Sequence, residues 1–138
     1  ESMRLRPPVW LLARSAEGDD EILGHDIPAG SMVFLPQWTL HRDPRFWSEP
    51  ERFEPERFLG ANAKTISKHL YFPFAGGPRV CIGQAFALME GKVILAHLAR
   101  AARFSAPEGQ PAPVPDPTIT LRPRGGLPLR VAWRGGPC

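Results

Sequence analysis

The sequence predicts a chain of mixed α and β structure with a small β-sheet, an irregular meander, a cysteine loop, a long buried helix and a terminal β-hairpin. Three observations support this fold class. Short apolar runs separated by turn residues in the first third are typical of short strands. Residues 82–102 are small or apolar around most of a helical circumference. Seventeen prolines and 13 glycines indicate much irregular structure between these elements.

The first third carries signals for one helix end and three strands. Residues 1–5 resemble the last turn of a helix that Pro7 and Pro8 stop. Strands are expected at residues 9–13, 21–23 and 32–35, the first of them buried, with turns at 17–20 and 26–30. Three short strands joined by tight turns predict one small sheet. A short helix is expected over residues 37–42.

The rest of the chain alternates irregular segments with one long helix. Residues 46–58 read as a meander anchored by Trp47, Phe53 and Phe58, and residues 60–69 as a surface loop. A helix buried on most faces is expected over residues 82–102, followed by a proline-rich connector. Strands at residues 118–121 and 129–133 predict the terminal hairpin, with its turn at residues 124–126.

Composition limits the possible functions. Hydrophobic residues make up 43% and charged residues 22% of the 138, which suits one globular domain or part of a larger one. The net charge of +3 is spread along the chain, so we expect no nucleic-acid binding. No apolar run is long enough to span a bilayer.

Cysteine and arginine usage bear on the cellular setting. Only Cys81 and Cys138 are present, which favours an intracellular, cytoplasmic protein over a disulfide-stapled secreted one. Arginine far outnumbers lysine, which favours a bacterial source. Because the chain opens with Glu1 and shows no signal peptide, we expect a segment of a longer protein, and an upstream membrane anchor stays open.

Residues 74–83 carry the most specific chemical signal. They place Cys81 on a glycine-lined turn, two residues after Arg79 and directly before the apolar helix. Backbone N–H groups of such a turn, and the positive end of the following helix dipole, favour a thiolate. A thiolate beside an arginine that can bind a carboxylate is what a haem iron with a cysteine axial ligand needs.

The spacing Phe-x-x-Gly-x-Arg-x-Cys-x-Gly resembles the haem-binding loop of the cytochrome P-450 family, the haem-thiolate monooxygenases. It is carried by Phe74, Gly77, Arg79, Cys81 and Gly83. The resemblance covers essentially the whole chain, from a Glu-x-x-Arg helix to the C-terminus. It implies that residues 1–138 are the C-terminal haem-binding part of a single, mainly-α domain whose N-terminal part is absent.

The resemblance implies a set of residues around haem b. Cys81 would be the catalytic residue and proximal iron ligand, whose strong sulfur donor favours cleavage of the O–O bond. Arg79 and Arg14 would pair with the haem propionates. Other cofactor contacts are expected from the loop and the start of the helix, namely Pro73, Phe74, Ala75, Val80, Ile82, Gly83 and Ala87.

A second motif of the family supports the same reading. Glu1 and Arg4 form a Glu-x-x-Arg pair, and Arg57 lies in the meander sequence Phe-Glu-Pro-Glu-Arg-Phe. The resemblance implies a buried structural triad of these three residues, which would be costly to break. His41 is interpreted as a packing histidine, and the other three histidines lack metal-ligand spacing.

Two segments correspond to the family's substrate cavity, although both patterns also suit plain core. They contribute Val9, Trp10 and Leu11, and Thr118 and Ile119. Their apolar character predicts a small apolar substrate. The implied reaction inserts one oxygen atom from O2, with electrons from a ferredoxin or flavoprotein reductase that docks near Cys81. The oxygen-activating helix would lie upstream of Glu1, so the segment alone is expected to be inactive.

Three alternatives stay open at this point. One keeps the haem but uses peroxide, as a hydroxylase or a fatty-acid peroxide isomerase. A second is a non-catalytic haem-binding sensor or an orphan fragment. A third is a small structural domain with a Cys81–Cys138 disulfide and no haem, although we interpret Cys138 as incidental.

Overall fold

The computed structural model describes residues 1–135, and Cys138 therefore lies outside the described residues. The chain starts with the short helix α1 (Ser2–Leu5), in which Arg4 and Leu5 are buried. Arg6 ends this helix with its N–H bonded to the carbonyl of Ser2, and Pro7 and Pro8 follow. The predicted helix end at residues 1–5 is confirmed.

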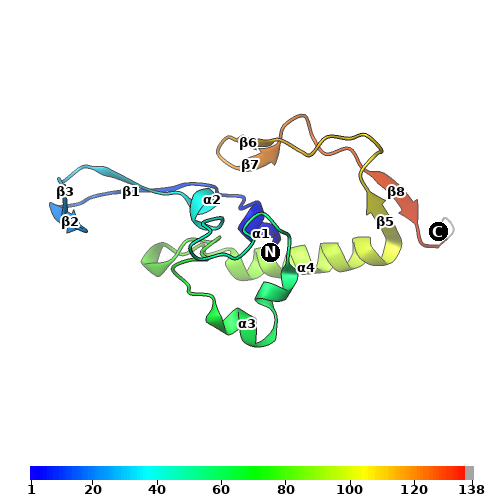
Figure 1. The fold of residues 1–138 in the computed structure, drawn as a ribbon, viewed down its shortest axis with the longest axis horizontal. Helices are drawn as coiled ribbons and strands as arrows, with labels where there is room; N and C mark the ends of the chain where they lie inside the picture. Colours follow the sequence, from blue (N-terminus) through cyan, green and yellow to red (C-terminus); the bar gives the residue numbers. More distant parts are fainter. Residues whose placement is uncertain (136–138) are drawn as a thin grey trace.

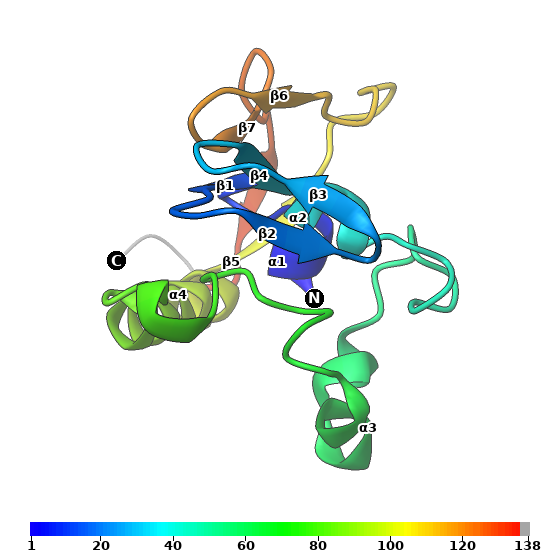
Figure 2. The same cartoon turned by 90° about the vertical axis from the view of Figure 1, so that its left-hand side faces the viewer.

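A long antiparallel ribbon follows α1. Its base pairs β1 (Leu12–Ser15) with β4 (Met32–Leu35), and its tip pairs β2 (Asp20–Ile22) with β3 (His25–Ile27). Figure 1 shows this ribbon extending away from α1, and Figure 2 views the molecule from the side of its tip, with β2 and β3 in front. The prediction of β4 is confirmed, whereas the single three-stranded sheet is wrong because the four strands form two separate pairs.

Two boundaries in the ribbon differ from the prediction. The first strand begins at Leu12 rather than at residue 9, and its residues are exposed or half-buried. The carbonyl of Trp10 instead accepts a hydrogen bond from the Trp38 N–H, which ties the preceding segment to the next helix. The tip turn lies at Leu23–Gly24, both with positive φ, so part of the predicted turn at 26–30 is strand β3.

The middle of the chain is compact around one aromatic cluster. Helix α2 (Gln37–Leu40) confirms the predicted short helix. Trp47 is 5% exposed and packs against Phe58, but Phe53 is 59% exposed and does not anchor the meander. A 3-10 helix (Pro55–Phe58) leads to α3 (Gly60–Thr65), so the predicted surface loop is partly helical. Two alanines in α3 favour helix where the polar composition indicated a loop.

The last third contains α4 (Gln84–Ala101) and two further strand pairs. Strand β5 (Ala102–Ser105) pairs with β8 (Arg130–Trp133), and β6 (Pro115–Pro117) pairs with β7 (Leu121–Pro123). The predicted terminal hairpin is therefore wrong. Strand β8 pairs with β5, the strand that directly follows α4. These two strands lie side by side in Figure 1 although they are distant in sequence.

Helix α4 is not buried on most faces, which corrects a central expectation. None of its residues is buried, and Phe86, Leu95 and Met89 are all more than half exposed. The accessible surface is 10774 Å², against about 7,200 Å² for a compact monomer of this mass. The apolar sequence of α4 indicates burial, but nothing in residues 1–135 covers it. No helix in this part of the chain is both long and apolar enough to cross a bilayer.

The tip turn of the ribbon provides a stability prediction. Leu23 has φ 53°, which is unfavourable for a leucine, and its side chain is 95% exposed. A two-residue turn with two positive φ angles favours the sequence Asn-Gly. We expect Leu23→Asn to stabilise the hairpin by about 0.5–1 kcal/mol, measured as slower amide exchange across β2 and β3. Gly24→Ala, at φ 81°, should speed the same exchange. Unchanged exchange in both variants would contradict this account.

Candidate functional site

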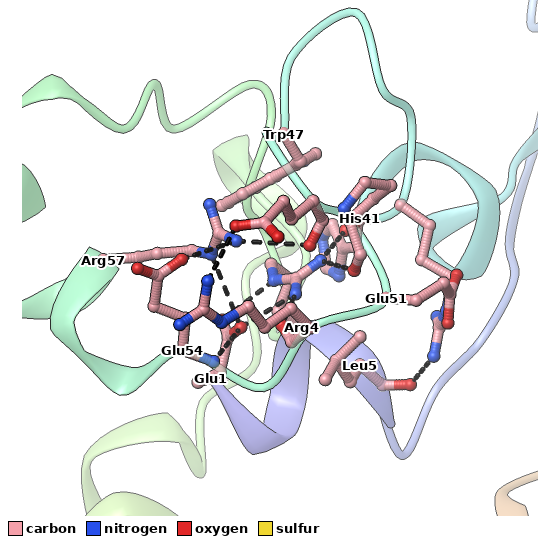
Figure 3. Close-up of polar contacts among 12 residues, drawn as sticks. Glu1, Arg4, Leu5, His41, Trp47, Glu51, Glu54 and Arg57 are labelled. Carbon is pink, nitrogen blue, oxygen red and sulfur yellow. Dashed lines mark hydrogen bonds and ion pairs between the residues drawn. The ribbon is translucent and has the colours of Figure 1, made fainter.

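Arg4 is the centre of the buried polar network. Its side chain is fully buried, and its Nε and Nη2 donate to the carboxylate of Glu1, both at 2.8 Å. Nη1 donates to the carbonyls of His41 (2.8 Å) and Pro50 (2.7 Å), and Nη2 also donates to that of Arg52 (3.0 Å). All five guanidinium N–H donors therefore have partners. Figure 3 shows these contacts converging between α1 and the meander.

Arg57 joins the network from the meander, so the structure brings the three residues of the expected triad together. Its Nε lies 3.6 Å from Glu1 Oε1, and its Nη2 lies 2.8 Å from Glu54 Oε2. The Glu54 N–H also donates to Glu1 Oε1 at 3.0 Å. Burial raises the pKa of the Glu1 carboxyl, but hydrogen bonds from Arg4 and Glu54 and the charge of Arg4 lower it overall. Glu1 is thus held as a carboxylate.

The network predicts unequal costs for its two arginines. Arg4→Met leaves the Glu1 carboxylate and three carbonyls without their donor, and we expect a loss of about 3–5 kcal/mol in unfolding free energy. Arg4→Lys should rescue little, because one ammonium cannot replace five donors in a fixed fork. Arg57→Ala should cost less, about 1–3 kcal/mol, because its Nε has only an ion pair at 3.6 Å. Urea unfolding measures the order, and equal losses for both arginines would contradict it.

His41 packs against the irregular segment that leads to the cysteine loop. It is fully buried, and its ring lies 5.3 Å from that of Tyr71 and 5.5 Å from that of Phe72. Its Nε2 accepts a hydrogen bond from the Phe72 N–H at 3.3 Å. Burial, followed by the positive charges of Arg4 and Arg42, lowers the pKa of His41 to about 4. A neutral, packed imidazole agrees with the interpretation from sequence.

This pKa predicts a pH dependence of stability. Between pH 6.5 and about 4 the unfolded imidazole binds a proton that the folded one does not, so stability falls as the pH falls through this window. The contribution of His41 is complete above pH 6.5, and up to about 3 kcal/mol is lost near pH 4. Urea unfolding at several pH values should give a flatter profile for His41→Gln than for wild type. Parallel profiles would contradict the assignment.

The cysteine loop is closed by backbone hydrogen bonds. The Ala75 N–H donates to the Phe72 carbonyl and the Cys81 N–H donates to the Phe74 carbonyl, both at 2.9 Å. Gly77 has φ 68° and starts a 3-10 turn (Gly77–Arg79). Helix α4 begins at Gln84, whose N–H donates to the Cys81 carbonyl, so the predicted start at residue 82 is two residues early. Cys81 is a free, exposed thiol just before a helix N-terminus.

An open hollow of about 740 Å³ collects the predicted polar groups. Cys81, Arg79 and Arg14 line it, although Arg14 is 65 or more residues away in sequence from the other two. Most of the remaining lining is apolar, namely Val9, Leu12, Pro73, Phe74 and Ala75 among others, and Ser15 and Glu17 add two polar groups beside Arg14. One soft sulfur ligand, two cations and an apolar wall fit a flat apolar macrocycle that carries a metal and two carboxylates.

The other expected cofactor contacts lie outside this lining. Val80, Ile82, Gly83 and Ala87 are not among the residues that line the hollow, and Ile82 is fully exposed. Gly83 is nevertheless close to the thiol, since a Cβ built on it would lie 3.8 Å from Cys81 Sγ. The structure therefore gathers part of the predicted set around the sulfur.

The two predicted substrate segments lie side by side. The Trp10 Nε1 donates to the Thr118 carbonyl at 2.8 Å, and the Leu121 N–H donates to the Pro8 carbonyl at 2.8 Å. Of the expected cavity residues only Val9 lines the hollow. Leu11 is half-buried and Ile119 is 95% exposed.

Sequence reasoning missed one residue beside the cysteine loop. Gln37 is fully buried at the start of α2, and its Nε2 donates to the Phe72 carbonyl at 2.7 Å. A glutamine is usually exposed, so its presence near an apolar run carried no signal. Only the three-dimensional structure shows that Gln37 contacts Phe72, because the two residues are far apart in sequence.

Comparisons with known proteins agree on one family. The family model for cytochrome P450 matches residues 1–129. The chain is 41% identical over 135 residues to cytochrome P450 3A27 of Oncorhynchus mykiss, covering 97% of this chain and 26% of that protein. It is 42% identical over 127 residues to putative cytochrome P450 132 of Mycobacterium bovis, covering 92% and 27%.

A third relative is thromboxane-A synthase of Sus scrofa, which is 38% identical over 135 residues, covering 97% of this chain and 25% of that protein. The chain therefore spans about a quarter of the length of these curated relatives.

Proposed function

Because this chain belongs to the cytochrome P450 family, we propose that it is the C-terminal, haem-ligating part of a haem-thiolate monooxygenase. The observation that carries this proposal is the hollow that Cys81 shares with Arg79 and Arg14. The motif places the first two near each other by spacing alone. Arg14 comes from a different element, β1, and its arrival at the same hollow supports a single ligand that all three residues hold.

The residues of the hollow fit haem b, which when bound supplies the oxygen-activating chemistry. Cys81 is the proposed iron ligand, and the adjacent helix N-terminus would favour the negative charge of its sulfur when the metal is bound. Arg79 and Arg14 are the proposed partners of the two propionates, because planar guanidinium groups bind carboxylates in a bidentate manner. Phe74 and Ala75 also line the hollow, and as apolar groups they would exclude water from the sulfur side of a bound haem.

The exposed apolar surface supports a larger protein. Helix α4 has no buried residue, and the total surface exceeds that of a compact monomer by about half. We propose that the remainder of a single domain covers α4 and completes the haem pocket, and that the isolated segment is inactive. The relatives, about four times as long, agree in size with such a domain.

The substrate and partner follow as proposals from the same surfaces. Val9, the expected cavity residue that lines the hollow, favours a small apolar substrate, into which one oxygen atom from O2 is inserted. An electron donor such as a ferredoxin or a flavoprotein reductase is proposed to dock on the exposed face near Cys81.

Cys81→Ser provides the decisive test of the haem ligand. In the full-length protein, reduced under carbon monoxide, we expect wild type to show the red-shifted Soret band of a thiolate complex and the variant to lose it, because a serine hydroxyl is a poor substitute for the thiolate. Cys138→Ser is the matched control and should keep the band. An identical, unshifted band in wild type and Cys81→Ser would overturn the assignment.

A further inference from the structure

Two fully buried polar side chains of one helical turn contact the same residue. Gln37 and His41 are four residues apart at α2 and are both 0% exposed. Gln37 Nε2 donates to the Phe72 carbonyl at 2.7 Å, and His41 Nε2 accepts from the Phe72 N–H at 3.3 Å. Positions i and i+4 share a helix face, so the pair holds both polar groups of Phe72 at once.

Phe72 is the first residue of the turn that opens the cysteine loop. Its carbonyl also accepts the Ala75 N–H at 2.9 Å, which closes the turn and leaves Ala75 at φ 63°. The Phe74 carbonyl, inside this turn, accepts the Cys81 N–H at 2.9 Å. A short chain of hydrogen bonds thus joins α2 to the backbone of the proposed iron ligand.

The contact of His41 requires a neutral ring with its proton on Nδ1. Burial and the charges of Arg4 and Arg42, the two cations that face it, keep the pKa of His41 near 4, so Nε2 stays an acceptor at neutral pH. The His41 carbonyl also accepts from Arg4 Nη1 at 2.8 Å. The same residue therefore links the Glu1–Arg4 network to the cysteine loop.

We propose that Gln37 and His41 are positioning residues for Cys81, which grip Phe72 on both sides and thereby fix the turn that presents the sulfur. This inference rests on the proposed function, because positioning matters only if Cys81 is a ligand. A loop without contacts to the rest of the chain would leave the sulfur free to take several positions. Hydrogen bonds behind a ligand restrict that freedom.

The test compares variants that keep or remove each contact in the full-length haem protein. His41→Gln retains an acceptor near the position of Nε2, whereas His41→Met and Gln37→Met remove one contact each at similar volume. Leu5→Ala is the matched control, since Leu5 is buried (7% exposed) and its side chain is not part of this hydrogen-bond chain. The readout is the share of the reduced carbon monoxide complex that lacks the thiolate Soret band.

We expect His41→Met and Gln37→Met each to raise that share about fivefold, the effect of losing one buried hydrogen bond. His41→Gln and Leu5→Ala should stay close to wild type. Equal shares in all four variants would overturn the proposal, whether all resemble wild type or all lose the band through instability. If His41→Met fails to fold, Gln37→Met decides by the same comparison with Leu5→Ala.

A second readout needs no haem. We expect amide exchange at Ala75 and Cys81 in the haem-free protein to be about fivefold faster in His41→Met and Gln37→Met than in Leu5→Ala. The reason is that each of the first two variants removes one of the hydrogen bonds that hold Phe72. Exchange that matches Leu5→Ala would overturn the proposal. A different result would separate the two proposals. If wild type lacks the thiolate band but the variants still show the faster exchange, Cys81 is not the haem ligand, and the contacts of Gln37 and His41 with Phe72 still fix the loop.

Discussion

The buried guanidinium of Arg4 is the interaction on which the rest of this structure depends. A charge without solvent contact is costly, and Arg4 is stable only because Glu1 and three backbone carbonyls receive all five of its N–H groups. Those carbonyls belong to His41 and to the meander, so α1 and the meander cannot separate without exposing unpaired groups. Trp47 packs against the same guanidinium, with 5.1 Å between the Arg4 Cζ and the ring centroid.

This polar network compensates for a very small apolar core. Leu5, Trp47 and Ala102 are the buried hydrophobic residues of the described chain, whereas the larger fully buried side chains include Arg4, Gln37 and His41. A core of this kind contributes little hydrophobic free energy to folding. It instead favours one arrangement of the chain, because each buried polar group forms its hydrogen bonds in only a few geometries. Helix α4 adds nothing to this core, because none of its residues is buried.

Local patterns predicted local structure well. The helix end before Pro7, the strand at residues 32–35 and the helix that follows Cys81 each depend on neighbours in sequence, and each is present. The errors concern partners and surroundings. The pairing of β8 with β5, and the exposure of α4, depend on which distant surface is available, and no periodicity contains that information.

The sequence by itself determined the family: a cysteine two residues after an arginine, before an apolar helix, follows the pattern of the cytochrome P450 family, whose family model matches residues 1–129. Tertiary structure alone decided that Gln37 and His41 meet Phe72, and it placed Arg14, which the family resemblance had implied, at the hollow of Cys81. The reason is physical. Motif spacing places groups within one turn of backbone, whereas contacts across 30 or more residues exist only once hydrogen bonds and burial have fixed the path of the chain between them.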